Sequence, residues 1–173
     1  MSDHNTDRGV NGTPLDADAF WNFAYDLYGD PAVSAACLHL QDTCGARVNL
    51  LLLGLWFAER RVAPTDPDVL AKAAEEWHHS LVMPLRALRR SLKEEAAIDP
   101  DVADLRRDLQ AAELRGERIE QRRLIAAATI HEDSSTAWLE PVLRAWSGTR
   151  SDADVRSVHA LITALARTET KTK

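Results

Sequence analysis

The sequence predicts an all-α protein: a single-domain helical bundle of about six to seven helices, in which the fourth and fifth form a long antiparallel hairpin. Three observations support this. Apolar residues recur at helical spacing along most of the chain. Only 7 Gly and 7 Pro occur in 173 residues, too few for a loop-rich fold. Asp-Pro pairs and single glycines mark starts and stops typical of helices.

The third predicted helix is apolar all round, so we expect it to lie at the centre of the bundle. The fourth is expected to kink or break before Pro84. Glycine ends the first two helices, and no stretch alternates as a strand would. The expected helices cover about 18–28, 30–44, 47–61, 66–97, 99–130, 135–146 and 152–167.

The length and the 45% apolar content suit one domain with a sizeable core. We expect a helical domain over 16–167 because the helical patterns span it. Residues 1–15 and 168–173 are polar and carry little to bury, which favours disordered tails.

Charge and cysteine usage indicate a cytoplasmic protein. The formal net charge of −6 suits solubility and makes nucleic acid an unlikely partner, because nucleic-acid binding depends on a positive field. No secretory signal opens the chain, and the longest apolar run, 48–58, is far shorter than the ~20 residues of a membrane span. Cys37 and Cys44 lie ~10 Å apart along one predicted helix, too far for a disulfide.

Three polar residues fall in or beside the apolar stripe of the fifth predicted helix: Glu113, Glu120 and Arg123. They predict either a polar site inside the bundle, for a metal or an anionic ligand, or a salt bridge at its edge. We prefer a salt bridge between Glu120 and Arg123, because such stripes more often carry structural ion pairs than sites.

Glu76 and His79 form the one Glu-x-x-His pair of the chain. Dimetal helical bundles use two such pairs on facing helices. A single copy favours an ion pair on a solvated face, so the sequence predicts no metal site and no cofactor. No nucleophile motif occurs either, and hence no catalytic residue is predicted.

Two further features are candidates for an interface or a ligand. Arg86, Arg89 and Arg90 form a basic end of the fourth helix, which either binds an acidic protein, phosphate or nucleic acid or is neutralised by Glu94, Glu95 or the acidic start of the fifth helix. The acidic start across a short turn favours neutralisation. Trp77 lies among charged residues, as an interface anchor often does, although core packing is the commoner fate of tryptophan.

Several short patterns resemble a small proteobacterial all-helical family of unknown function. The resemblance covers about 20–132 and implies a bacterial cytosolic protein, but it carries no activity or catalytic residue to transfer. The patterns are Trp21-x-Phe23-Ala24-x-x-x-Tyr28, Ala36-Cys37-Leu38-x-Leu40-Gln41-Asp42, Gly45-x-x-Val48-Asn49-x-Leu51-Leu52, Pro84-Leu85-Arg86 and Arg89-Arg90-x-Leu92-Lys93.

These observations favour a non-enzymatic protein with an adaptor or regulatory role that acts through protein–protein contacts, with a protein partner or a second copy. The alternative is a helical-bundle enzyme or a small-ligand or metal-binding protein, with a polar site on the fourth and fifth helices. The absence of any catalytic signature in the sequence favours the first hypothesis.

Overall fold

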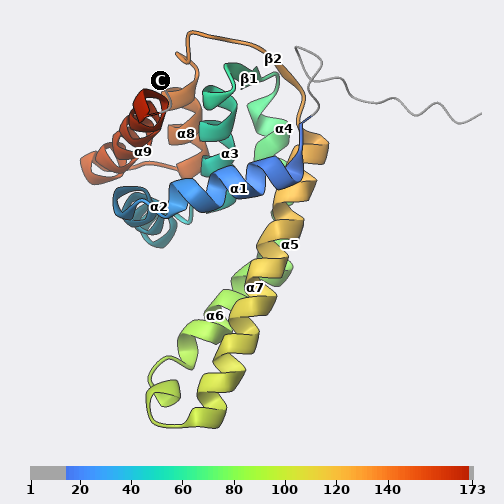
Figure 1. Ribbon diagram of the computed structural model, residues 1–173, viewed down its shortest axis with the longest axis vertical. Helices are drawn as coiled ribbons and strands as arrows, with labels where there is room; N and C mark the ends of the chain where they lie inside the picture. The colour runs from blue at the N-terminus through green and yellow to red at the C-terminus, as the bar shows by residue number, and fades with distance from the viewer. Residues whose placement is uncertain (1–14, 172–173) are drawn as a thin grey trace, which may run out of the picture. The chain divides into compact units, whose positions relative to one another are not determined.

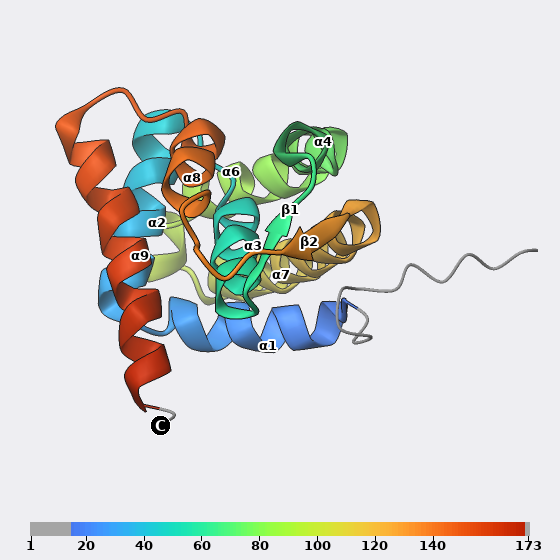
Figure 2. The ribbon, with the colours of Figure 1, turned by 90° about the horizontal axis from the view of Figure 1, so that it is seen from above.

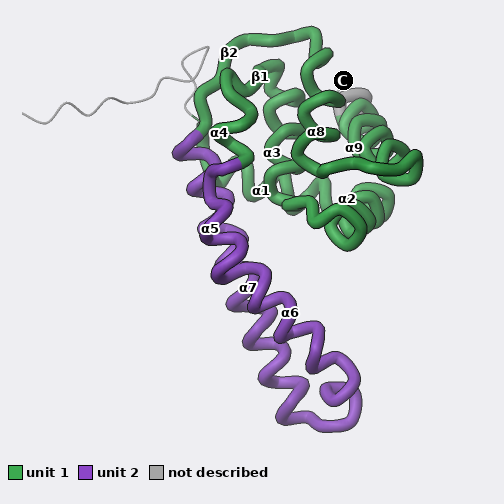
Figure 3. Tube along the Cα trace, turned by 180° about the vertical axis from the view of Figure 1, so that it is seen from behind, with its two compact units in different colours: residues 1–71, 128–173 green, residues 72–127 purple. Residues whose placement is uncertain are grey.

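The computed structural model describes residues 15–171, with side chains as far as residue 168. The chain forms two compact units, one of residues 1–71 and 128–173 and one of residues 72–127 (Figure 3). The described chain is helical apart from short connections and one two-stranded sheet, which confirms the predicted all-α class. The expected tail over 1–15 lies almost entirely outside the described residues.

Unit 1 is built around α3, which contacts α1, α2, α8, α9 and β1. Helix α9 runs beside α2 (Figure 2), although more than a hundred residues separate them in the sequence. The elements of this unit (Figure 1) are α1 (Ala17–Tyr28), α2 (Pro31–Cys44), α3 (Val48–Glu59), β1 (Val62–Pro64), α4 (Pro67–Lys72), β2 (Ile130–Glu132), α8 (Leu139–Ser147) and α9 (Asp152–Lys171).

Helix α3 is buried along nearly its whole length, as its apolar composition predicts. Leu53 and Phe57 are completely buried, and Trp56 stacks on Phe20 of α1 with ring centroids 5.3 Å apart. Because each side of the helix faces another element, no polar face is required. Helix α3 is therefore the core of unit 1.

Gly54 allows α8 to pack closely on α3. A Cβ at this position would lie 3.0 Å from Leu143 Cδ2 and 3.1 Å from Trp146 Cζ3. We expect Gly54→Val to lower the free energy of unfolding by about 1–3 kcal/mol, because the added atoms overpack this contact. Thermal unfolding of Gly54→Ala and Gly54→Val should show a graded loss, and equal stability of the valine variant and the wild type would contradict the close packing.

Helix boundaries follow the signals in the sequence. Asp30, Asp66 and Asp99 each accept backbone N–H bonds at the start of a helix. Gly45 has a φ of 72° and ends α2 in the left-handed conformation that favours glycine. These local features explain why the predicted helices exist, and most of their ends agree to within a few residues.

Asp154 joins the start of α9 to α2. Its carboxylate accepts N–H bonds from Arg150 and Ser151, and the Ser151 hydroxyl accepts the N–H of Asp154, which together form a capping box with Asp in the place of the usual Glu. His39 Nε2 lies 2.9 Å from the same carboxylate, and the Thr43 hydroxyl donates to it. The backbone bond from Arg150 and these other contacts hold the pKa of Asp154 well below its usual value.

Strands β1 and β2 correct the expectation of a strand-free chain. They pair antiparallel, with Val62 opposite Glu132 and Pro64 opposite Ile130. Helix α7 therefore ends at Ala127, three residues earlier than predicted. Strands of three residues are too short for a periodic pattern, and their partners lie far apart in the sequence, so no local signal identifies them.

Unit 2 is a helical hairpin. A continuous helical segment over 75–91 pairs with α7, and its first contacts are with the C-terminal half of α7, so the two run antiparallel as predicted. The elements are α5 (Glu75–Trp77), the π-helical segment η2 (His78–Val82), α6 (Met83–Ser91), the 3₁₀ turn η3 (Glu95–Ala97) and α7 (Pro100–Ala127).

The predicted fourth helix is more interrupted than expected. It breaks at Ala73–Ala74, where Ala74 has a φ of 58°, and it ends at Ser91. Before Pro84 the helix does not break but widens into η2, in which the N–H of Met83 bonds to His78, five residues back. Proline lacks the N–H of a regular helical turn, and a π-helical turn accommodates such an irregularity.

Near the C-terminus, α8 begins at Leu139, later than predicted, and α9 continues past Arg167 to Lys171. Among the helices that the structure describes, none combines the length and apolar character needed to cross a membrane.

Candidate functional site

The inner face of the unit 2 hairpin combines apolar side chains, such as Leu81 and Val82 opposite Gly116, with several buried polar and charged ones. Helix α6 has no buried residue at all. Three of the buried residues of α7 are polar or charged, and carboxylates lie where a helical hairpin normally places leucine. The buried residues of α7 are Glu113, Gly116, Glu120, Gln121 and Leu124.

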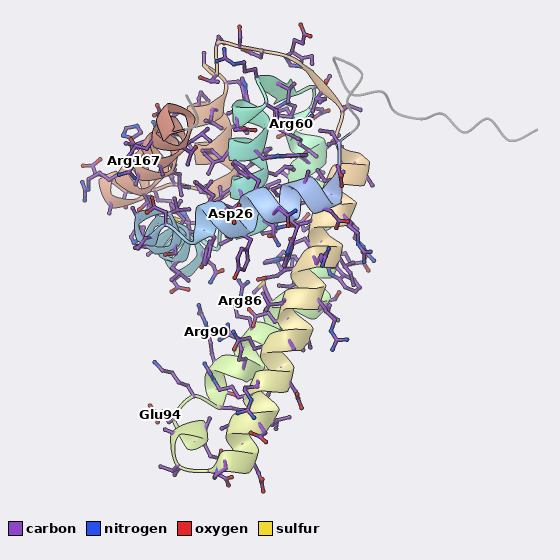
Figure 4. The ribbon with its side chains drawn as sticks, in the orientation of Figure 1. Asp26, Arg60, Arg86, Arg90, Glu94 and Arg167 are labelled. Carbon is purple, nitrogen blue, oxygen red and sulfur yellow. The ribbon has the colours of Figure 1, made fainter. Side chains whose placement is uncertain are left out.

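Two arginines of α6 and two glutamates of α7 form an ion-pair network. Arg86 Nε lies 2.8 Å from Glu113 Oε1, and Arg86 Nη2 lies 2.5 Å from Glu117 Oε1. Arg89 Nε lies 2.5 Å from the second oxygen of Glu113. The spacings are i, i+3 on α6 and i, i+4 on α7, so each pair shares one helix face. Figure 4 labels Arg86 on α6.

The pKa values of the two carboxylates in this network shift in opposite directions. Burial opposes ionisation of Glu113, but hydrogen bonds from Arg89 and Arg86 outweigh it and lower the pKa of Glu113 below its usual value. Burial raises the pKa of Glu117, and Arg86 offsets this only in part. The contacts with Glu113 and Glu117 raise the pKa of Arg86 despite its burial. Glu113 is therefore the carboxylate whose charge the network stabilises.

A second polar pair joins η2 to α7. His78 Nδ1 lies 3.1 Å from Glu120 Oε1, and the two side chains are only 8% and 1% exposed. The π-helical turn offsets the register of the residues that follow it by one position relative to an α-helix. The buried pair and the irregular turn thus occur at the same residue, His78.

Trp77 lies directly before this pair. Its indole N–H donates to the Gly116 carbonyl at 2.9 Å, and the Arg123 guanidinium lies 4.3 Å from the centre of its ring. A Cβ on Gly116 would approach Leu81 to 3.0 Å, so glycine permits the close approach of the two segments. Trp77 thus stabilises the hairpin by a hydrogen bond and a cation–π contact.

The structure brings together six of the residues singled out from sequence. Trp77 and Arg123 are in contact, Arg86 and Arg89 meet Glu113, and Glu120 belongs to the same inner face. The expected Glu120–Arg123 pair is corrected, because Glu120 lies against His78 and Arg123 over Trp77.

The other candidates lie apart from this cluster. Glu76, His79 and Arg90 are exposed. His79 donates to the backbone carbonyl of Glu75 rather than pairing with Glu76. Arg86 and Arg89 are neutralised from the middle of α7, not from its acidic start as the sequence suggested.

Sequence reasoning missed two members of the cluster, His78 as a partner and Glu117. Glu117 could have been predicted from a helical wheel, because Glu113, Glu117 and Glu120 follow an i, i+4, i+7 spacing on one helix face. His78 had no such signal, because its orientation depends on the π-helical turn.

The chemistry of the cluster is that of paired charges. Two guanidinium groups face two carboxylates, and an imidazole faces a third carboxylate. Across the part of the chain that the structure describes, no three His, Cys, Asp or Glu side chains are grouped to hold a metal ion. The arrangement favours one register of the two helices, because Arg86 spans Glu113 and Glu117 while Arg89 bonds to the second oxygen of Glu113.

The fold and the cluster define a helical protein with an internally charged hairpin. The chain belongs to the family described as "Protein of unknown function (DUF2390)", which matches residues 19–124, from α1 into α7. This agrees with the resemblance to a helical family of unknown function. No curated protein and no solved structure matches the chain.

Proposed function

We propose that the protein is a non-enzymatic binding protein of the bacterial cytoplasm with an adaptor or regulatory role, and that the hairpin of unit 2 is its partner-binding element. One observation supports this most strongly: buried charged residues hold the two helical segments of the hairpin together, while several of its large apolar side chains are exposed. Its ion pairs hold it together, which leaves its apolar residues for contact with another protein.

The exposed apolar residues are concentrated in unit 2. Ile98, between η3 and α7, is 85% exposed, and Leu105 is 51% exposed. A solvated hairpin normally buries such residues between its helices. The exposed large apolar residues of unit 2 are Met83, Leu88, Ile98, Leu105 and Leu114.

The partner that fits these side chains is a protein with an apolar surface. Large aliphatic side chains gain free energy when they leave water, at ~25 cal/mol per Å² of apolar area. A hairpin whose two helices are already joined by ion pairs also loses less conformational entropy on binding than an unpaired segment, which favours affinity. Both features support a docking role for unit 2.

A photo-crosslinking amino acid at position 98 or 105 tests this proposal in cells. We expect crosslinks from these positions to a distinct protein, identified by mass spectrometry. Leu38 of α2 is similarly exposed and lies in unit 1, so the same amino acid at position 38 is the matched control. If positions 98 and 105 give no crosslinks beyond those of position 38, the hairpin is not the binding element.

A second candidate function is a small-ligand site or enzyme centre at the polar cluster. The observation that favours it is the buried His78–Glu120 pair on a π-helical turn, because such turns are frequent at functional sites. A thermal-shift screen with divalent metals and anionic metabolites tests it. A ligand that stabilises the wild type but not Glu120→Gln would support this candidate, and no shift with any compound would count against it.

A further inference from the structure

The outer face of α7 carries an ordered charge pattern that the polar cluster does not use. Asp101, Asp108, Arg115 and Arg122 follow one another at intervals of seven residues, and all four are exposed. Seven residues are nearly two helical turns, so these side chains share one edge of α7. The first half of this edge is acidic and the second half is basic.

This segregation of charge is unfavourable within α7 itself. Arg118 lies three residues after Arg115 and four before Arg122, and like charges at these spacings repel. In the part of the chain that the structure describes, no ion pair forms at Asp101, Asp108, Arg115 or Arg122. The inner face differs, because Glu113 is matched there by Arg86 and Arg89.

We propose that the outer face of α7 pairs in antiparallel fashion with the same face of a second copy of this chain. In that arrangement Asp101 lies opposite Arg122 of the second copy, and Asp108 lies opposite Arg115. The midpoint of both pairs falls between Ala111 and Ala112, which places a two-fold axis there. Every charge on this edge then meets its opposite, and the same pairs recur on the other side of the axis.

The residues near the axis suit a close helix crossing. Ala111 is exposed and small, and Leu114, which is 47% exposed, supplies an apolar contact one turn away. A strict seven-residue spacing drifts by ~20° per heptad on a straight helix, and a left-handed crossing of ~20° compensates for this drift. The charge edge can therefore stay aligned over its whole length.

Charge complementarity favours a second copy over other occupants. Nucleic acid would be repelled by Asp101 and Asp108, and a wholly acidic protein would meet the same repulsion. An antiparallel copy satisfies both halves of the edge at once. This inference goes beyond the proposed docking role, which rests on apolar side chains such as Ile98.

Sedimentation analysis of the purified full chain tests self-association. Exposed ion pairs are individually weak and screened by salt, so we expect a weak dimer in about 50 mM NaCl that dissociates as the salt is raised. The double variants Asp101→Arg/Asp108→Arg and Arg115→Asp/Arg122→Asp should each weaken self-association at least about tenfold. A wild type that remains monomeric at low salt and high concentration would overturn the proposal.

Mixing the two variants separates pairing from misfolding. One then presents only arginine along the edge and the other only aspartate, so together they should form a heterodimer that neither forms alone. Glu76→Arg/Glu94→Arg changes the net charge as much as the first variant, at exposed positions outside α7, and should leave self-association unchanged. Failure of the mixture to associate, or equal loss in this control, contradicts edge-to-edge pairing.

Geometry provides an independent readout. In a Cys44→Ser background, Ala111→Cys should crosslink readily to its counterpart in the second copy, because both lie at the axis. Each Ala126 lies 14.5 residues from the two-fold axis. Spin labels on Ala126→Cys should therefore be about 44 Å apart, measured along the helices. A parallel pair would bring these labels close together, and that result would exclude the antiparallel arrangement.

Discussion

Replacing Glu113 by alanine is expected to lower the free energy of unfolding of unit 2 by about 3 kcal/mol. Both oxygens of this carboxylate accept bonds, one from Arg86 and the other from Arg89. Its removal leaves two partly buried guanidinium groups with fewer acceptors, which costs more than the lost attraction alone. Hydrogen exchange of α7 amides, compared with those of α3, should place the loss in unit 2.

The effect of Glu113→Ala should depend on pH with a definite sign. The pKa of Glu113 is lowered in the folded chain, so its ionised form stabilises the fold above its ordinary pKa. The difference between wild type and variant should be full near neutral pH and should shrink as the pH falls below about 4.5. A difference that stays constant at acidic pH would contradict the role of the charge.

Glu117 supplies the matched control on the same helix. Burial raises its pKa, so its ionised form is less stable in the folded chain than in the unfolded chain. The contribution of Glu117 to the free energy of unfolding therefore decreases as the pH rises through its raised pKa. Glu117→Gln keeps an oxygen for Arg86 and should cost less than about 1 kcal/mol near neutral pH. Equal losses for the two variants would show that Arg86, not Glu113, dominates the network.

Replacing Phe57 by alanine is expected to cost about 3–5 kcal/mol of unfolding free energy. Phe57 is completely buried in α3 and lies 6.0 Å, centroid to centroid, from Trp56. Truncation removes the transfer free energy of the ring and leaves a cavity in the centre of unit 1. Chemical denaturation followed by circular dichroism and tryptophan fluorescence measures the loss.

Leu38→Ala is the control for this core substitution. Leu38 belongs to α2 in the same unit but is 42% exposed, so a smaller share of its surface becomes exposed on unfolding than for Phe57. We expect its cost to stay below about 1 kcal/mol. Comparable losses for the two variants would mean that α3 is not the central helix of the core.

The sequence predicts most of the fold because the relevant signals are local. Asp30, Asp66 and Asp99 cap helices through bonds to residues two positions away, and the apolar run of α3 identifies the core without reference to its neighbours. Strand pairing is different, since Ala63 pairs with His131, and several helices lie between these two residues in the sequence. Such a pairing depends on the tertiary fold and leaves no trace in three residues.

The sequence identified several residues of the candidate site, but not which of these residues contact each other. Glu113 and Glu120 stood out because carboxylates in an apolar stripe are unusual. Their partners could not be assigned from the sequence, because the register between α6 and α7 depends on the position of the π-helical segment η2 before α6. His78 of η2 meets Glu120, and Arg123 lies over Trp77 instead.

The π-helical turn also bears on how this hairpin tolerates insertions and deletions. Such a turn holds one residue more than the α-helical turn it replaces. Deleting one residue within 78–82 would restore a regular turn and leave the rest of α6 in phase with α7. A deletion within 83–88 would instead rotate the following side chains by ~100° and misalign Arg89 with Glu113. Length variation among relatives is therefore expected at η2, where the helix can absorb it.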